Sequence, residues 1–140
     1  MGEGNPFEGV GVISVYTRQQ ALEDGMLVDV TETAREAGFT LPTAVTRNVW
    51  ERCVRVPDGL EGLGQSEQGR LWDVLWLASI AARGSPANGE SPDLREFQVS
   101  VVESQRPDGS PGHGQHRLWL HIGPGDTLDP VLTVMFPEDY

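Results

Sequence analysis

The segment Glu67–Arg83 constrains the fold most, because its apolar residues fall on nearly every side of a helix. Ser66 stands where it can cap the first turn, and Leu71–Ala82 is the most apolar part. A helix that is apolar all round has to be covered on several faces. Trp72 and Trp76 lie one turn apart and are expected to stack on one of those faces. The sequence therefore predicts a central, buried helix.

Short elements are predicted on the N-terminal side of this helix. Gly25 and Gly38 suit the left-handed residue that ends a helix, and Thr17 with Gln20 forms a capping-box pattern. The expected helices are Arg18–Asp24, Glu32–Ala37 capped by Thr31, and Arg47–Val54 capped by Thr46, and the expected extended segments are Val12–Tyr16, Met26–Val30 and Leu41–Val45. A loop rich in glycine, Pro57–Gly64, leads to the central helix.

Beyond the loop Gly84–Pro92 the periodicity changes from helical to alternating. Three stretches, Phe97–Val101, Arg117–Ile122 and Val131–Phe136, alternate in the way typical of strands with one buried face. The turn-forming residues of Gln105–Gln115 indicate a long mobile hairpin loop. The predicted fold is α+β, with an N-terminal helical half containing short strands, one central buried helix and a C-terminal three-stranded antiparallel sheet.

Length and charge exclude several classes of protein. The 140 residues fit one acidic domain, 1–140, with 1–11 as a flexible arm. All ten basic residues are arginine, so the chain has no lysine for a Schiff base or a phosphate loop. A net charge of -11 opposes direct binding to nucleic acid or to a membrane surface. No secretory signal or membrane span is recognisable, so we expect a cytoplasmic protein.

The surplus of carboxylates predicts a cationic partner. Glu32 and Glu36 lie one turn apart, a mild repulsion that helices usually avoid. Such acids can imitate phosphates and occupy the cationic channel of a nucleic-acid-handling protein; alternatively, they only keep the surface solvated. The candidate acids are Glu23, Asp24, Asp29, Glu32 and Glu36.

Three further candidates lie on the second predicted strand of the sheet. Arg117, Trp119 and His121 share the face opposite its aliphatic residues. An exposed tryptophan beside arginine and histidine is typical of a binding hot spot. The alternative is that helices cover both faces of the sheet, which would make Trp119 part of the core.

Asp73 is the one candidate for acid–base chemistry. A carboxylate within an apolar helix either finds hydrogen-bond donors or has a raised pKa. It is therefore either a general acid or base beside Trp72 and Trp76, or a structural group that holds an amide, an indole or Arg70. We favour the structural interpretation and assign no catalytic residue.

A metal site is not expected, and neither is a cofactor. His116 and His121 are five residues apart on a predicted strand, so they point to opposite faces. His113 falls in the predicted mobile loop, and Cys53 is the only cysteine. We expect solvent-exposed histidines rather than zinc ligands.

Three stretches, Ile13–Ala21, Leu27–Phe39 and Gly69–Trp76, resemble an uncharacterised bacterial family that is known only as a domain of unknown function. The resemblance covers nearly the whole chain and assigns no catalytic residue. It implies an origin on plasmids, phages and other mobile elements, sometimes among genes that counter host defence. In size, charge and implied setting the chain is similar to inhibitors of CRISPR and restriction systems.

The leading hypothesis is thus a non-enzymatic, anti-CRISPR-like inhibitor of a host nucleic-acid-targeting defence complex. It would bind a cationic protein surface through its acidic residues and the face that carries Trp119, as a mimic of nucleic acid. Two alternatives stay open. One is a small hydrolase-like enzyme that uses Asp73, and the other is an accessory protein of mobile elements with no inhibitory role.

Overall fold

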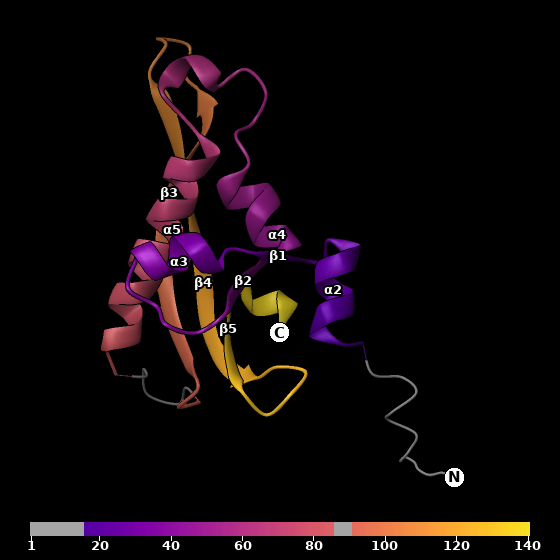
Figure 1. Ribbon diagram of the computed structural model, residues 1–140. Helices are drawn as coiled ribbons and strands as arrows, with labels where there is room; N and C mark the ends of the chain where they lie inside the picture. The colour runs from indigo at the N-terminus through magenta and orange to yellow at the C-terminus, as the bar shows by residue number, and fades with distance from the viewer. Residues whose placement is uncertain (1–15, 86–90) are drawn as a thin grey trace.

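A five-stranded sheet forms the centre of the protein, whose computed structural model describes residues 16–85 and 91–140 (Figure 1). The strands follow the order β1-β2-β5-β4-β3. Strands β2 and β5 are parallel, and the other neighbours are antiparallel, so the sheet is mixed. The strands are β1 Leu27–Asp29, β2 Thr43–Thr46, β3 Leu94–Gln105, β4 Pro111–Pro124 and β5 Pro130–Met135.

The longest helix, α5 (Glu67–Arg83), lies over one face of the sheet beside α3 (Thr31–Glu36). A third helix begins as α4 (Arg47–Val49) and continues as the π-helix η1 (Trp50–Val54), which also packs against α5. The remaining helices are α2 Arg18–Asp24 and the 3₁₀ turns η2 Glu61–Leu63 and η3 Pro137–Asp139. None of the helices in the described part is long and apolar enough to cross a bilayer.

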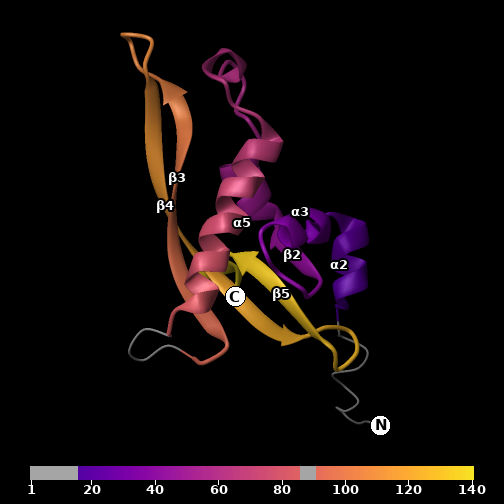
Figure 2. The same ribbon diagram turned by 60° about the vertical axis from the view of Figure 1, so that its left-hand side comes forward.

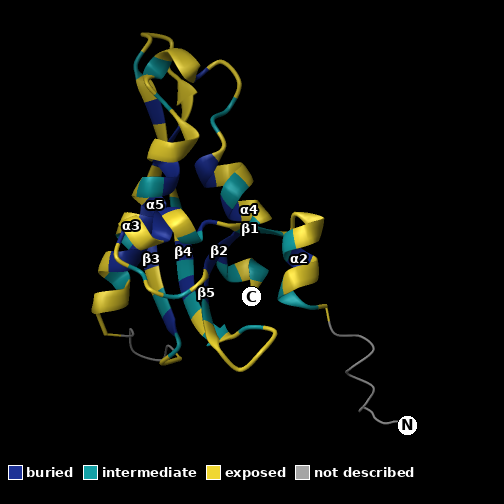
Figure 3. Cartoon of the chain, viewed as in Figure 1, coloured by how far each residue is buried: buried dark blue, intermediate teal, exposed yellow. Residues whose placement is uncertain are grey.

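The core lies between α5 and the sheet. Leu71, Val74, Leu75 and Ala78 of α5 are buried, at the spacing expected for one side of a helix (Figure 3). Each fully buried leucine or valine contributes about 1.5–3 kcal/mol to stability. The residues that meet them from the sheet and from the other helices are Ala34, Val45, Val49, Cys53, Phe97, Val99, Leu118, Leu120, Leu132 and Val134. The central helix therefore has its predicted bounds, but only one side of it is buried.

The predicted three-stranded antiparallel sheet is wrong. The short N-terminal strands join the C-terminal ones in a single sheet, because β2 pairs in parallel with β5 through Thr43 to Leu132 and Val45 to Val134. Without β2, the backbone groups along that edge of β5 would be buried and unpaired. Ala44 and Val45 of β2 are fully buried. Burial on both faces is the usual environment of a strand that has a parallel neighbour.

The predicted long loop Gln105–Gln115 is also wrong, since β3 extends to Gln105 and β4 begins at Pro111. The connection is a tight turn in which the Asp108 carboxylate accepts bonds from the Ser110 amide and hydroxyl. The resulting hairpin projects past the end of α5 (Figure 2). Gly114 lies within β4, where its missing Cβ leaves room for the Glu103 side chain of β3. The arm 1–11 and the segment Val12–Tyr16, apart from Tyr16, fall outside the described residues.

Candidate functional site

The two acids predicted on α2 make local hydrogen bonds. Asp24 accepts a bond of 2.7 Å from the Tyr16 hydroxyl, which raises the pKa of that tyrosine. Glu23 accepts one of 3.1 Å from Gln19, one turn earlier. Both residues are exposed at the surface. They contribute to the field of the protein, but neither is free of internal contacts.

Asp29 has a structural contact at the start of α3. Its carboxylate accepts bonds from both the amide and the hydroxyl of Thr31, at 3.2 and 2.6 Å. Asp29, rather than the predicted Thr31, thus provides the side-chain oxygen at this helix start. The Thr31 hydroxyl in turn accepts a bond from the Thr43 amide and so ties α3 to β2.

Glu32 and Glu36 are the least constrained of the predicted acids. Both are exposed on α3, whose other side buries Thr33 and Ala34 against the core. Within residues 16–85 and 91–140 no hydrogen bond or ion pair engages either carboxylate. Gln68 of α5 donates to the Thr33 hydroxyl, so α3 lies directly beside α5.

Arg117, Trp119 and His121 lie on the face of the sheet opposite α5, as expected from the alternation. The Trp119 indole donates to Glu96 at 3.1 Å, and Arg117 lies 3.7 Å from the same carboxylate. The C-terminal Tyr140 packs its ring edgewise against both Trp119 and His121. Trp119 is therefore half-buried, neither a core residue nor fully exposed. Its neighbour Arg117 forms an ion pair with Glu96.

The predicted partner-binding residues thus do not form one surface. Glu32 and Glu36 lie on the side of the sheet covered by α5, whereas the set around Trp119 lies on the other side. A single flat partner surface cannot contact both sets at once. Of the five predicted partner-binding acids, only Glu32 and Glu36 of α3 have carboxylates that no hydrogen bond or ion pair engages within the described residues.

Asp73 is exposed, so the expectation of a carboxylate within an apolar environment is wrong. The preceding turn explains the difference, because Arg70, and not Asp73, points into the interior and is 5 % exposed. Arg70 donates to the carbonyls of Cys53 and Val102. Among the described residues it makes no ion pair with Asp73.

Histidine and cysteine do not form a ligand cluster in the part of the chain that the structure describes. His116 packs on Phe136 and His121 on Tyr140, so the two histidines point to opposite faces as predicted. His113 belongs to strand β4 and not to a loop. Burial raises the pKa of the Cys53 thiol to about 11, which keeps it protonated at neutral pH.

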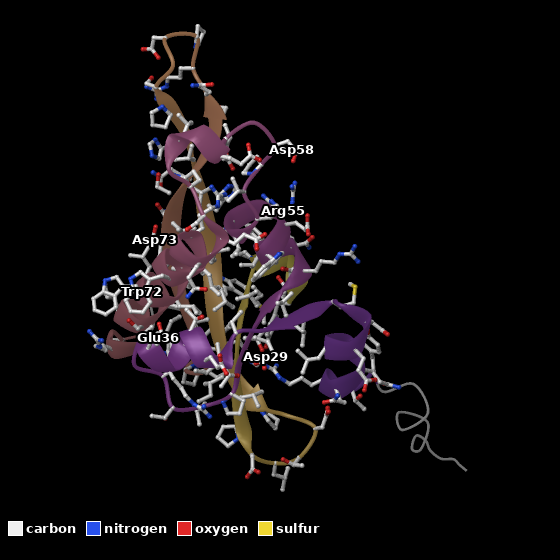
Figure 4. All side chains as sticks on the ribbon, turned by 45° about the horizontal axis from the view of Figure 1, so that its top comes forward. Asp29, Glu36, Arg55, Asp58, Trp72 and Asp73 are labelled. Atoms are coloured by element: carbon white, nitrogen blue, oxygen red, sulfur yellow. The ribbon has the colours of Figure 1, made fainter. Side chains whose placement is uncertain are left out.

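One surface was not recognised as a binding site in the sequence. Trp72 and Trp76 stack as predicted, with ring centroids 5.9 Å apart and planes at 16°. Trp72 is half-buried against the core, whereas Trp76 and Ile80 are exposed, and these three side chains form a row on α5 that we call the tryptophan shelf. Figure 4 shows Trp72 pointing away from the body of the protein, with Asp73 on one side and Glu36 of α3 on the other. The sequence feature that indicates this surface is the presence of apolar residues on nearly every side of the helix. The fold covers only one side, so the apolar residues on the other side stay at the surface.

Together, these features define an acidic α+β domain with one mixed sheet, one long helix and a solvent-facing surface of indoles and carboxylates. The chain belongs to a family of unknown function (DUF6573), and the model of this family matches residues 3–140. It matches no curated protein and no solved structure. The expectation of an uncharacterised family is confirmed at that level, and no activity comes with it.

Proposed function

We propose that this protein acts without catalysis, by binding a positively charged surface of another protein. The observation that carries the proposal is the imbalance between its two kinds of charge. The chain has 21 acidic residues against ten arginines, and within the described residues only three carboxylates pair with an arginine. The excess negative charge is therefore presented to solvent and to a partner.

The arginines show this imbalance most directly. Seven of the ten make a hydrogen bond, an ion pair or a contact with an aromatic ring inside the protein. In the described part of the chain they pair with only three carboxylates, Glu51, Glu96 and Glu138. The seven are Arg18, Arg52, Arg55, Arg70, Arg83, Arg95 and Arg117.

A charge of this size attracts a cationic surface over a distance of about 8–10 Å at moderate salt, and it speeds encounter. The grooves of proteins that handle nucleic acid are the strongest cationic surfaces of this kind, because they are built to neutralise phosphates. The target in this proposal is such an effector, of the CRISPR type or another nucleic-acid-targeting defence complex. The carboxylates of Glu32 and Glu36 would occupy positions of phosphates in its groove. A mobile-element origin, implied by the family resemblance, fits this target.

The test compares two double variants with the same change in charge. Glu32→Gln with Glu36→Gln removes the acids of α3, and the control, Asp58→Asn with Asp129→Asn, removes two exposed acids elsewhere. Each variant is titrated against purified effector complexes between about 0.05 and 0.5 M salt. We expect the α3 variant to bind about tenfold more weakly and the control to change less than about twofold.

Competition with the nucleic acid of the effector completes the experiment. An effector already loaded with its target should not bind the protein, because both occupy the same groove. An affinity that does not change with ionic strength, or binding that persists on the loaded effector, would contradict the proposal. Equal weakening by both double variants would show that total charge, and not the position of the α3 acids, determines binding.

A further inference from the structure

The tryptophan shelf is an apolar row without a covering element in the described part of the chain. Trp72, Trp76 and Ile80 follow one another at intervals of four residues, so they form a line along the surface of α5. Trp76 is 42 % exposed and Ile80 47 %, although the other side of the same helix is fully buried. A contiguous row of apolar side chains at the surface is one of the features that mark a binding surface.

The Trp76 indole already contacts a guanidinium group from its own chain. The Cζ atom of Arg83 lies 5.8 Å from the centroid of the Trp76 ring, within the range of a cation–π contact. The stacked arrangement with Trp72 keeps both rings roughly parallel. Each stacked ring also has a face turned away from the other ring, and a second planar cation can stack there.

Carboxylates flank the shelf on both sides. In Figure 4 the labelled Asp73 of α5 and Glu36 of α3 lie on opposite sides of Trp72, and α3 packs beside α5. Neither makes an ion pair within the described residues. At the N-terminal end of the shelf, Trp72 and Asp73 line a hollow of about 230 Å³ together with Gly69 and the chain before it. The hollow is large enough to hold a side-chain head group next to the Asp73 carboxylate.

We infer that the tryptophan shelf binds an arginine-bearing segment of a partner protein. A guanidinium of that segment stacks on the indoles of Trp72 and Trp76 and pairs with the carboxylates of Asp73 and Glu36. The planar, weakly hydrated guanidinium fits this combination of ring and carboxylate better than the compact ammonium of lysine. The inference rests on the proposed function, since it names the chemistry by which a cationic partner is recognised.

Charge selects this occupant over two others. A nucleic acid strand could stack its bases on the indoles, but its phosphates would be repelled by Asp73, Glu36 and the net charge of -11. A second copy of this chain would bring two sets of carboxylates together, which is unfavourable for the same reason. An arginine-rich segment meets attraction from both the rings and the acids.

The test uses two short peptides of equal length and charge, one with arginine and one with lysine. Each is titrated into the ¹⁵N-labelled full-length protein while the indole N–H signals of its four tryptophans are recorded. Trp72→Phe and Trp76→Phe assign the two shelf signals. We expect the arginine peptide to shift both of them and leave the Trp119 signal in place. The lysine peptide should bind about tenfold more weakly.

Matched variants separate the shelf from the rest of the surface. Trp76→Ala should weaken binding of the arginine peptide about tenfold, and Trp119→Phe should change it less than about twofold. Trp76 is exposed, so the variant is expected to fold, and a thermal unfolding curve recorded for each variant checks this. A loss of affinity without loss of stability supports direct contact with the ring.

Different results would overturn the inference in distinguishable ways. Equal binding of both peptides with unmoved shelf signals would reject the shelf and leave the proposed function intact, because charge alone would then explain binding. Failure of the arginine peptide to bind at all would also reject the shelf, while the effector titration decides separately on the proposed function. Shifts of the same signals by a single-stranded oligonucleotide, or a concentration-dependent dimer that Trp76→Ala abolishes, would assign the surface to another occupant.

Discussion

Arg70 is the single side chain that joins most parts of the fold. Its guanidinium donates to the carbonyl of Cys53 at 3.2 Å, to that of Val102 at 2.8 Å and to the Gln65 side chain at 3.1 Å. It thereby links the end of the π-helix, the outer edge of β3 and the loop before α5. Burial lowers the pKa of this guanidinium, and its Nη2 atom has no hydrogen-bond partner among the described residues.

Replacing Arg70 with methionine tests this link. The change removes a buried charge, which is favourable, but leaves the carbonyls of Cys53 and Val102 without their donor. Each buried carbonyl left unsatisfied costs about 1–3 kcal/mol, so the loss of the hydrogen bonds outweighs the relief of desolvation. We expect the free energy of unfolding in urea to fall by about 2 kcal/mol.

The exposed Arg47 supplies the control for that measurement. Arg47→Met makes the same chemical change at a side chain for which the structure records no hydrogen bond or ion pair within the described residues. It should alter stability by less than about 0.5 kcal/mol. If both variants lost the same stability, the hydrogen bonds of Arg70 would have no special importance.

Among the elements, α2 depends on a contact far away in the sequence. The Asp126 carboxylate, in the turn between β4 and β5, accepts bonds from the backbone amides of Arg18 and Gln19. These are first-turn amides that no residue within the helix can satisfy. The Arg18 side chain returns the contact by donating to Thr133 and to the Leu132 carbonyl of β5. A seven-residue helix would be marginal without such contacts.

We therefore predict that Asp126→Ala loosens α2 specifically. The loss of the distant cap should cost about 1 kcal/mol, and the amides of α2 should exchange with solvent several times faster while those of α5 are unchanged. Hydrogen exchange measured by NMR reports both helices in one experiment. Asp129→Ala, in the same turn, is the control, because it leaves the bonds to α2 in place. Uniformly faster exchange of both helices would instead indicate global destabilisation.

Local signals in the sequence predicted the elements, and long-range contacts determined how they assemble. The caps at Thr17, Thr46 and Ser66 are confirmed, because each side chain meets an amide only three residues ahead. The Asp126 cap and the parallel pairing of β2 with β5 join residues roughly 90 to 110 positions apart, which no local pattern encodes. For the same reason the strands were predicted but their common sheet was not.

The candidate site was predictable to a similar extent. The stacking of Trp72 on Trp76 follows from their spacing of four residues, and the structure confirms it. Whether the fold covers these rings does not follow from their spacing, because the sequence does not show which apolar side chains stay at the surface. The helix α3, which carries Glu36, lies beside the helix of the shelf through a contact between separate elements, which the sequence does not encode locally.

The whole molecule combines these features with a charge that acts on folding and on binding in opposite ways. At a net charge of -11, the carboxylates repel one another most strongly in the compact state, so self-repulsion opposes folding. Added salt screens this repulsion beyond about 8–10 Å and should stabilise the folded protein. The same screening weakens attraction to a cationic partner.

We predict opposite responses to salt in two measurements on the same protein. Raising sodium chloride from about 0.02 to 0.3 M should increase the midpoint of thermal unfolding by a few degrees and reduce affinity for the partner by at least about tenfold. Glu32→Gln with Glu36→Gln should reduce both salt responses, because these two carboxylates repel each other along α3 and face the partner. A variant that lost only the response of binding would place Glu32 and Glu36 at the interface, with self-repulsion located elsewhere. Were salt to leave both quantities unchanged, surplus charge would govern neither folding nor recognition.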